Sequence, residues 1–205
     1  MNRNVDKEMR KVILDLLEKL KTIEYINPES IPNIELYMDQ VTSFFDGQLA
    51  ASKRKEDDKL LTKTMINNYT KNDLLPPPVK KKYSKEHMLS LIFIYYLKNI
   101  VSISDIHAIL TPITEKYFGN KDGHDMEDIY AEIFRMEKEE STKILKEFSK
   151  KYAISKETFQ NYPEEDQEML HAFSYICLLS FDVYMKTQLI EKIVDDVFTN
   201  SKEEA

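Results

Sequence analysis

Cysteine, glycine and proline are scarce in this chain, and tryptophan is absent. Among 205 residues there are 3 glycines, 7 prolines and 1 cysteine. A many-stranded sheet needs frequent turns, which glycine and proline favour, so the composition indicates long helices instead. The single cysteine, Cys177, excludes a disulfide within one chain and a thiolate metal cluster, which agrees with a reducing compartment.

Long apolar runs are also missing. The longest, from Leu91 to Leu97, is far shorter than the roughly 20 residues that cross a bilayer. A polar stretch and then an amphipathic pattern follow Met1, rather than the apolar block of a signal peptide. We therefore expect a cytoplasmic protein that does not enter the membrane.

The charges are unevenly distributed along the chain. The net charge is -7, and 42% of the residues are hydrophobic, which is typical of a globular protein. From Ala50 to Lys98 there are 11 basic and 5 acidic residues, whereas from Thr111 to Ala205 there are 12 basic and 21 acidic residues. The first of these segments is suited to a polyanion, and the second is repelled by one.

Apolar side chains recur at helical spacing along most of the chain, so we predict an all-α protein. One helix should follow Ser84 and carry Met88 to Leu97, and a short one should follow Ser102 and stop at Thr111-Pro112. We expect Ile34 and Tyr37 to point inward. The other predicted helices cover residues 5–25, 34–45, 61–71, 125–152 and 164–198.

The helix predicted over 61–71 has the features of a DNA-reading helix. Its free face carries polar side chains, and the Pro76-Pro77-Pro78 stop is followed by a run of lysines and a tyrosine. Asparagine can bind both edges of an adenine, and lysine contacts guanine or phosphate. A solvated face and a merely solubilising lysine run are the alternative. The DNA-binding candidates are Lys63, Thr64, Asn67, Asn68, Lys71, Lys80, Lys81, Lys82 and Tyr83.

Residues Met65 to Pro78, the Lys82-Tyr83-Ser84 step and the segments that follow resemble the MerR family of winged helix-turn-helix regulators. That family runs from a recognition helix through Leu-Leu-Pro-Pro and a wing to a long and then a short helix. Here the wing is reduced to a tight basic turn. The chain as a whole also resembles an uncharacterised bacterial family, domain of unknown function 1836.

The resemblance implies a dimeric transcriptional regulator that binds double-stranded DNA and senses an effector through its carboxy-terminal region. It divides the chain into an amino-terminal helix and connector (1–33), a MerR-like helix-turn-helix domain with a reduced wing (34–112) and a carboxy-terminal helical bundle (113–205) for dimerisation or effector binding. Antiparallel pairing of residues 164–198 is the expected homodimer interface. A small-molecule effector would lie among aromatic side chains that otherwise pack as core: Phe148, Tyr152, Phe173, Tyr175, Phe181 and Tyr184.

Competing functions find less support. Glu168 and His171 match half of a helical di-iron pattern, but no second pair exists, and His124 stands in a charged loop. No phosphate-binding glycine loop, nucleophile elbow or zinc pattern is present, so we predict neither an enzyme nor a cofactor. An all-helical protein-interaction adaptor without DNA binding is the alternative function. Cys177, among Tyr175 to Leu179, should be a buried packing residue.

Overall fold

The computed structural model describes residues 11, 14–19 and 25–199. Residues 11 and 14–19 are helical, Tyr25 is not, and the other residues of the helix predicted over 5–25 lie outside the described residues. The chain forms two compact units that are discontinuous in sequence. The core unit comprises residues 25–136 and 189–205, and the hairpin unit comprises residues 1–24 and 137–188. The predicted three-part division of the chain stays a prediction.

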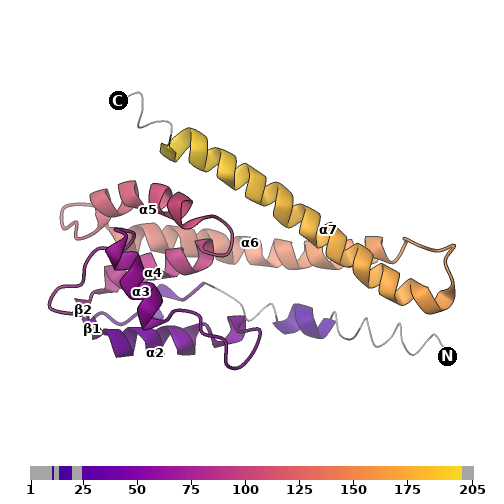
Figure 1. Cartoon of the computed structure of the whole chain (residues 1–205), viewed down its shortest axis with the longest axis horizontal. Coiled ribbons are helices and arrows are strands. Elements are labelled where there is room, and N and C mark those ends of the chain that lie inside the picture. Colours follow the sequence, from indigo (N-terminus) through magenta and orange to yellow (C-terminus); the bar gives the residue numbers. More distant parts are fainter. Residues whose placement is uncertain (1–10, 12–13, 20–24, 200–205) are drawn as a thin grey trace. The chain divides into compact units, whose positions relative to one another are not determined.

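The described chain is mostly helical, as predicted (Figure 1). Four helices match predicted ones closely in position: α3 (Lys63–Lys71), α4 (Lys85–Leu97), α6 (Met126–Ser155) and α7 (Glu164–Ile193). Short 3-10 turns cover Pro28–Ser30 and Ala50–Ser52, and a π-helical turn, Val194–Thr199, follows α7. The main elements in order are β1 (Leu36–Tyr37), α2 (Met38–Gln48), α3 (Lys63–Lys71), β2 (Lys82–Tyr83), α4 (Lys85–Leu97), α5 (Ile103–Tyr117), α6 (Met126–Ser155) and α7 (Glu164–Ile193).

Helix α4 lies at the centre of the core unit because it is apolar on nearly every side. Met88, Leu89, Leu91, Ile92 and Ile94 are each at most 1% exposed. Side chains of α2, α3, α5 and the first turns of α6 pack against it: Val41, Phe45, Ile66, Ile106, Met126 and Tyr130. The Tyr130 hydroxyl donates a 2.5 Å hydrogen bond to the Ile26 carbonyl oxygen, which fixes the chain entering the unit.

The start of α2 differs from the prediction. A short strand, β1, occupies residues that were expected to begin the helix, and it pairs antiparallel with β2 in the register Leu36 to Tyr83 and Tyr37 to Lys82. Ile34 and Tyr37 are 66% and 55% exposed, so the prediction that they point inward was wrong. Side chains alternate between the two faces of a strand, so Leu36 takes the buried side and its neighbours face outward.

Helix α5 does not stop at Thr111-Pro112, as the sequence had suggested. It continues through Pro112 to Tyr117. Proline inside a helix costs about 3 kcal/mol. Ile113 and Tyr117, beyond the proline, pack against the hydrophobic core, and this burial offsets the cost.

In the hairpin unit, the part of α6 after residue 136 and the part of α7 before residue 189 pack on each other through one face of each helix. The Tyr175 hydroxyl donates to the Phe148 carbonyl oxygen at 3.2 Å, the Tyr152 and Tyr175 rings lie 5.6 Å apart, and Lys151 pairs with Asp182. Cys177 is exposed, so the prediction that it is buried was wrong. Residues two apart on a helix point about 200° apart. Because Tyr175 faces α6, Cys177 points to the opposite side of α7, toward solvent.

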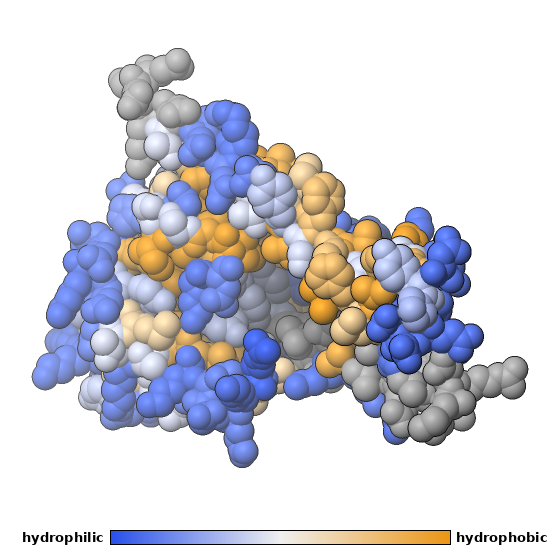
Figure 2. All heavy atoms as spheres, turned by 45° about the vertical axis from the view of Figure 1, so that its right-hand side comes forward, coloured by the Kyte–Doolittle hydropathy of each residue, from blue (hydrophilic) through white to orange (hydrophobic). Residues whose placement is uncertain are grey.

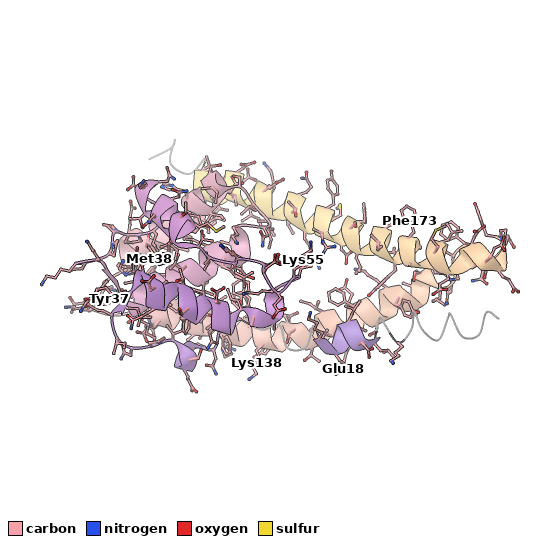
Figure 3. The ribbon with its side chains drawn as sticks, turned by 60° about the horizontal axis from the view of Figure 1, so that its bottom comes forward. Glu18, Tyr37, Met38, Lys55, Lys138 and Phe173 are labelled. Carbon is pink, nitrogen blue, oxygen red and sulfur yellow. The ribbon has the colours of Figure 1, made fainter. Side chains whose placement is uncertain are left out.

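The outer surface of α7 within the hairpin unit is rich in exposed apolar side chains. Figure 2 shows apolar residues in orange along this helix among hydrophilic ones in blue, and Figure 3 shows Phe173 projecting from it. Phe173, Phe181 and Tyr184 were predicted as core or pocket-lining residues, yet they are exposed because α7 has only one packed face in this unit. The exposed large residues here are Met169, Phe173, Ile176, Phe181, Val183, Tyr184 and Met185.

Candidate nucleic-acid interface

Helix α3 presents one polar face to solvent. The Thr62 hydroxyl accepts from the Met65 amide at 3.1 Å and caps the helix. Ile66 and Tyr69 are buried against the core, which turns the opposite face outward. The five candidate residues of this helix are all exposed: Lys63, Thr64, Asn67, Asn68 and Lys71.

The chain leaves α3 through a tightly fixed turn. The Leu74 and Leu75 amides both donate to the Tyr69 carbonyl oxygen, at 2.9 and 3.2 Å, with Asp73 in the left-handed conformation at φ 56°. Leu74 and Leu75 then bury their side chains in the core. This anchoring fixes where the Pro76-Pro77-Pro78 segment begins, so the lysine run after it emerges at a defined place.

Lys80 and Lys81 form the tip of a two-residue turn. The Lys82 amide donates to the Val79 carbonyl oxygen at 2.9 Å, and φ is 51° at Lys80 and 64° at Lys81. Positive φ at both central positions defines a type I′ turn, in which Asn and Gly are the usual residues. Both lysine side chains are exposed, and neither forms an ion pair within the described part of the chain. The backbone therefore presents two unneutralised ammonium groups side by side.

Tyr83 does not share this exposure. It is 3% exposed, lies opposite Leu36 in the strand pair, and its ring centroid is 5.5 Å from that of His87. Burial raises the pKa of its hydroxyl. Tyr83 was a candidate DNA contact, but its side chain packs in the core, so we assign it a structural part in holding β2.

His87 connects the turn to the start of α4. Its Nδ1 accepts from the Ser84 amide at 3.0 Å and lies 2.7 Å from the Ser84 hydroxyl, which completes a reciprocal cap. The ring is buried between Tyr83 and Phe118, whose centroid is 4.8 Å away. Desolvation lowers the pKa of His87, and the carbonyl groups of Pro77 and Pro76 partly oppose this effect.

The first turn of α2 brings the two candidate groups together. Tyr37 stands opposite Lys82 in the ladder, and the Lys82 ammonium lies 5.6 Å from the Tyr37 ring centroid. Two residues further on, Asp39 forms an ion pair with Lys63 at the start of α3. The lysine turn and the amino end of α3 therefore both adjoin the same turn of α2, which Figure 3 locates by Tyr37 and Met38.

Two acidic residues accompany the lysines at this place. Glu35 Oε2 lies 3.4 Å from Lys82 Nζ, and Asp39 neutralises Lys63. Glu35, Tyr37 and Asp39 were not among the predicted site residues. The alternation of Ile34 and Leu36 around Glu35 was the available signal for a strand, but it is too short to stand out from a helical pattern.

The other basic cluster lies elsewhere. Lys53 pairs with Asp46 at 3.3 Å near the end of α2, and the Arg54 and Lys55 amides both donate to Asp58. Figure 3 places Lys55 far from Tyr37 along α2. Lys53, Arg54 and Lys55 therefore form a separate ordered loop beyond α2 and are not part of the candidate interface.

Metal-binding patterns find no support in the described residues. These residues contain no group of three or more His, Cys, Asp or Glu side chains arranged to hold a metal ion. Nε2 of His171 bonds to the Thr158 carbonyl oxygen at 2.8 Å, and His124 lies 3.2 Å from Asp128. Among the described helices there is also none with the length and apolar character needed to span a membrane.

Comparison with known families identifies the domain that contains this interface. The model of the family Domain of unknown function (DUF1836) matches residues 26–133, more than half of the chain. The chain belongs to the DUF1836 family. The match includes α2, α3, the lysine turn, α4 and α5, so the candidate interface lies wholly within the DUF1836 domain. No curated protein and no solved structure matches the chain.

Proposed function

We propose that this DUF1836 protein is a dimeric DNA-binding transcriptional regulator with a MerR-like winged helix-turn-helix domain. The observation that carries the proposal is the meeting of two cationic, polar groups at the first turn of α2. One is the exposed face of α3, and the other is the turn formed by Lys80 and Lys81. The order strand, helix, helix, basic turn, paired strand and long helix agrees with the MerR resemblance.

In this proposal α3 enters the major groove. Asn67 and Asn68 read base edges, because their side-chain amides offer both donors and acceptors and make no hydrogen bond within the described residues. Lys71 contacts phosphate or guanine from the carboxyl end of the helix. Lys80 and Lys81 bind the flanking phosphates and so fix the register of α3 on the duplex.

Dimerisation would give the regulator two such units for a symmetric operator. The exposed apolar face of α7 in the hairpin unit supports this part of the proposal, since patches of this kind mark interaction surfaces. The MerR resemblance implies dimer formation and effector sensing through the carboxy-terminal region. We accordingly propose a homodimer through α7 and keep a small-molecule effector as part of the hypothesis.

A titration against labelled random-sequence duplex at two salt concentrations tests the proposal. Binding should be measurable at low salt and fall steeply as salt rises, because each neutralised phosphate releases counterions. Replacing Lys80, Lys81 and Lys82 with Ala should flatten the slope of log K against log salt. Lys138→Ala with Lys146→Ala and Lys150→Ala is the matched control, because these three exposed lysines of α6 belong to the hairpin unit and not to the unit that carries the candidate interface. Absence of binding at low salt would refute the proposal.

A protein-interaction adaptor without DNA binding is the second candidate. The exposed apolar face of α7 favours it, because such a face would serve another protein as well as a second copy of this chain. The adaptor hypothesis predicts no affinity for duplex DNA at low salt, so the same titration separates the two. If binding is found, selecting bound fragments from genomic DNA would identify the operator.

A further inference from the structure

Tyr37 is exposed at the place where the two cationic groups meet, although nothing in the core requires an aromatic residue there. Its neighbour Leu36 is buried, while the Tyr37 side chain is 55% exposed at the amino end of α2 (Figure 3). Two exposed apolar residues lie close to this strand pair in the sequence: Ile34 shortly precedes β1, and Val79 forms an isolated bridge with Lys82 of β2. An outward aromatic side chain with a polar hydroxyl is typical of a contact surface.

The backbone and one cation fix the position of this side chain. The Tyr37 amide donates to Gln40 Oε1 at 2.9 Å, which caps α2, and the residue is paired with Lys82 in the ladder. The Lys82 ammonium lies 5.6 Å from the ring centroid, within the range of a cation–π interaction. The ring therefore lies beside Lys82, and Lys63 is tied to the same turn of α2 by its ion pair with Asp39.

We infer that Tyr37 is a further DNA-binding residue, whose hydroxyl donates a hydrogen bond to a backbone phosphate between the groove read by α3 and the phosphates bound by Lys80 and Lys81. Tyrosine hydroxyl groups are among the usual phosphate donors in protein–DNA complexes. The exposed ammonium groups of Lys80 and Lys81 in the adjoining turn favour an anion near this position. The inference rests on the proposed function, since it concerns the same surface.

The test compares Tyr37→Phe with the parent protein in the duplex titration. Loss of one hydrogen bond to a charged oxygen should weaken binding about tenfold. The slope of log K against log salt should stay unchanged, because tyrosine carries no charge and releases no counterion. Tyr162→Phe is the matched control, because Tyr162 is 53% exposed and belongs to the hairpin unit. Equal melting temperatures of the two variants would confirm that folding is unaffected.

The outcomes separate the inference from the proposed function. If the parent protein binds DNA and Tyr37→Phe binds equally well, the inference is overturned and the proposed function stands. If Tyr37→Phe weakens binding and also flattens the salt slope, the variant has displaced the lysines, and the direct contact is likewise refuted. If the parent protein does not bind at low salt, both fail together.

Discussion

The backbone conformation of the turn at Lys80 and Lys81 should lower the stability of the protein, while the two lysine side chains strengthen its binding to DNA. Both residues have positive φ, a conformation that costs about 1–2 kcal/mol for a residue with a side chain, and less for Asn. Lys80→Asn together with Lys81→Gly places the preferred type I′ residues on the same backbone. We therefore expect the double variant to be more stable and to bind DNA less tightly.

The magnitude follows from two opposing terms. Relief of the backbone strain at both positions stabilises the folded state, whereas glycine increases the freedom of the unfolded chain by about 0.4–1 kcal/mol. The net gain is about 1 kcal/mol, which raises the melting temperature of a protein of this size by about 2–4 °C. Loss of two phosphate contacts should reduce the salt slope by about 1.8, taking about 0.9 for each contact.

Thermal unfolding followed by circular dichroism gives the first quantity, and fluorescence anisotropy with a labelled duplex over a series of salt concentrations gives the second. Lys146→Gln with Lys150→Gln removes the same charge from α6 and controls for net charge. A stabilised variant with an unchanged salt slope would show that these lysines do not bind phosphate. A destabilised variant would show that the turn does not have the described backbone.

Three further changes test other parts of the structure. Glu35→Gln frees Lys82 from its ion pair, so the salt slope should steepen by about 0.9 while stability changes little, as measured by the same titration and by urea unfolding. Burial lowers the pKa of His87 in the folded state, whereas in the unfolded chain this pKa is about 6.5. As the pH falls below about 6.5, the unfolded chain therefore binds a proton at His87 more readily than the folded protein does. Stability should therefore fall as the pH decreases below about 6.5, and His87→Gln, which keeps the cap with Ser84, should reduce this loss in urea unfolding at two pH values. Phe173→Glu should weaken self-association in sedimentation equilibrium, whereas Thr142→Glu, at an exposed polar position of α6, should not.

The long helices were predictable because their apolar spacing persists over many turns. For α4, α6 and α7 the sequence alone placed the helix, and for α3 it also identified the exposed face. Chemistry that depends only on the local chain, such as capping by Thr62 and Ser84, is visible in the sequence. The exposed candidates on α3 and at Lys80 and Lys81 belong to this predictable part.

What the sequence did not reveal depends on distant partners. Two residues, Leu36 and Tyr37, form a strand only because β2 lies beside them, and the same pairing buries Tyr83. Pro112 is tolerated inside α5 only because the residues after it pack in the core. Cys177 lies among apolar neighbours in the sequence but on the unpacked side of its helix. In each case tertiary contacts override a local pattern.

The net charge of -7 predicts a departure from simple salt dependence. At physiological ionic strength charges are screened beyond about 8 Å, so the lysine turn and α3 dominate the contact with DNA. At about 0.01 M salt the screening length reaches roughly 30 Å, and the acidic segment from Thr111 onward then repels the duplex. Log K against log salt should therefore flatten at the lowest salt. Neutralising Glu115 and Asp122, two exposed acidic residues of the core unit, should restore part of the linearity, and a plot that is already linear in the parent protein would refute this account.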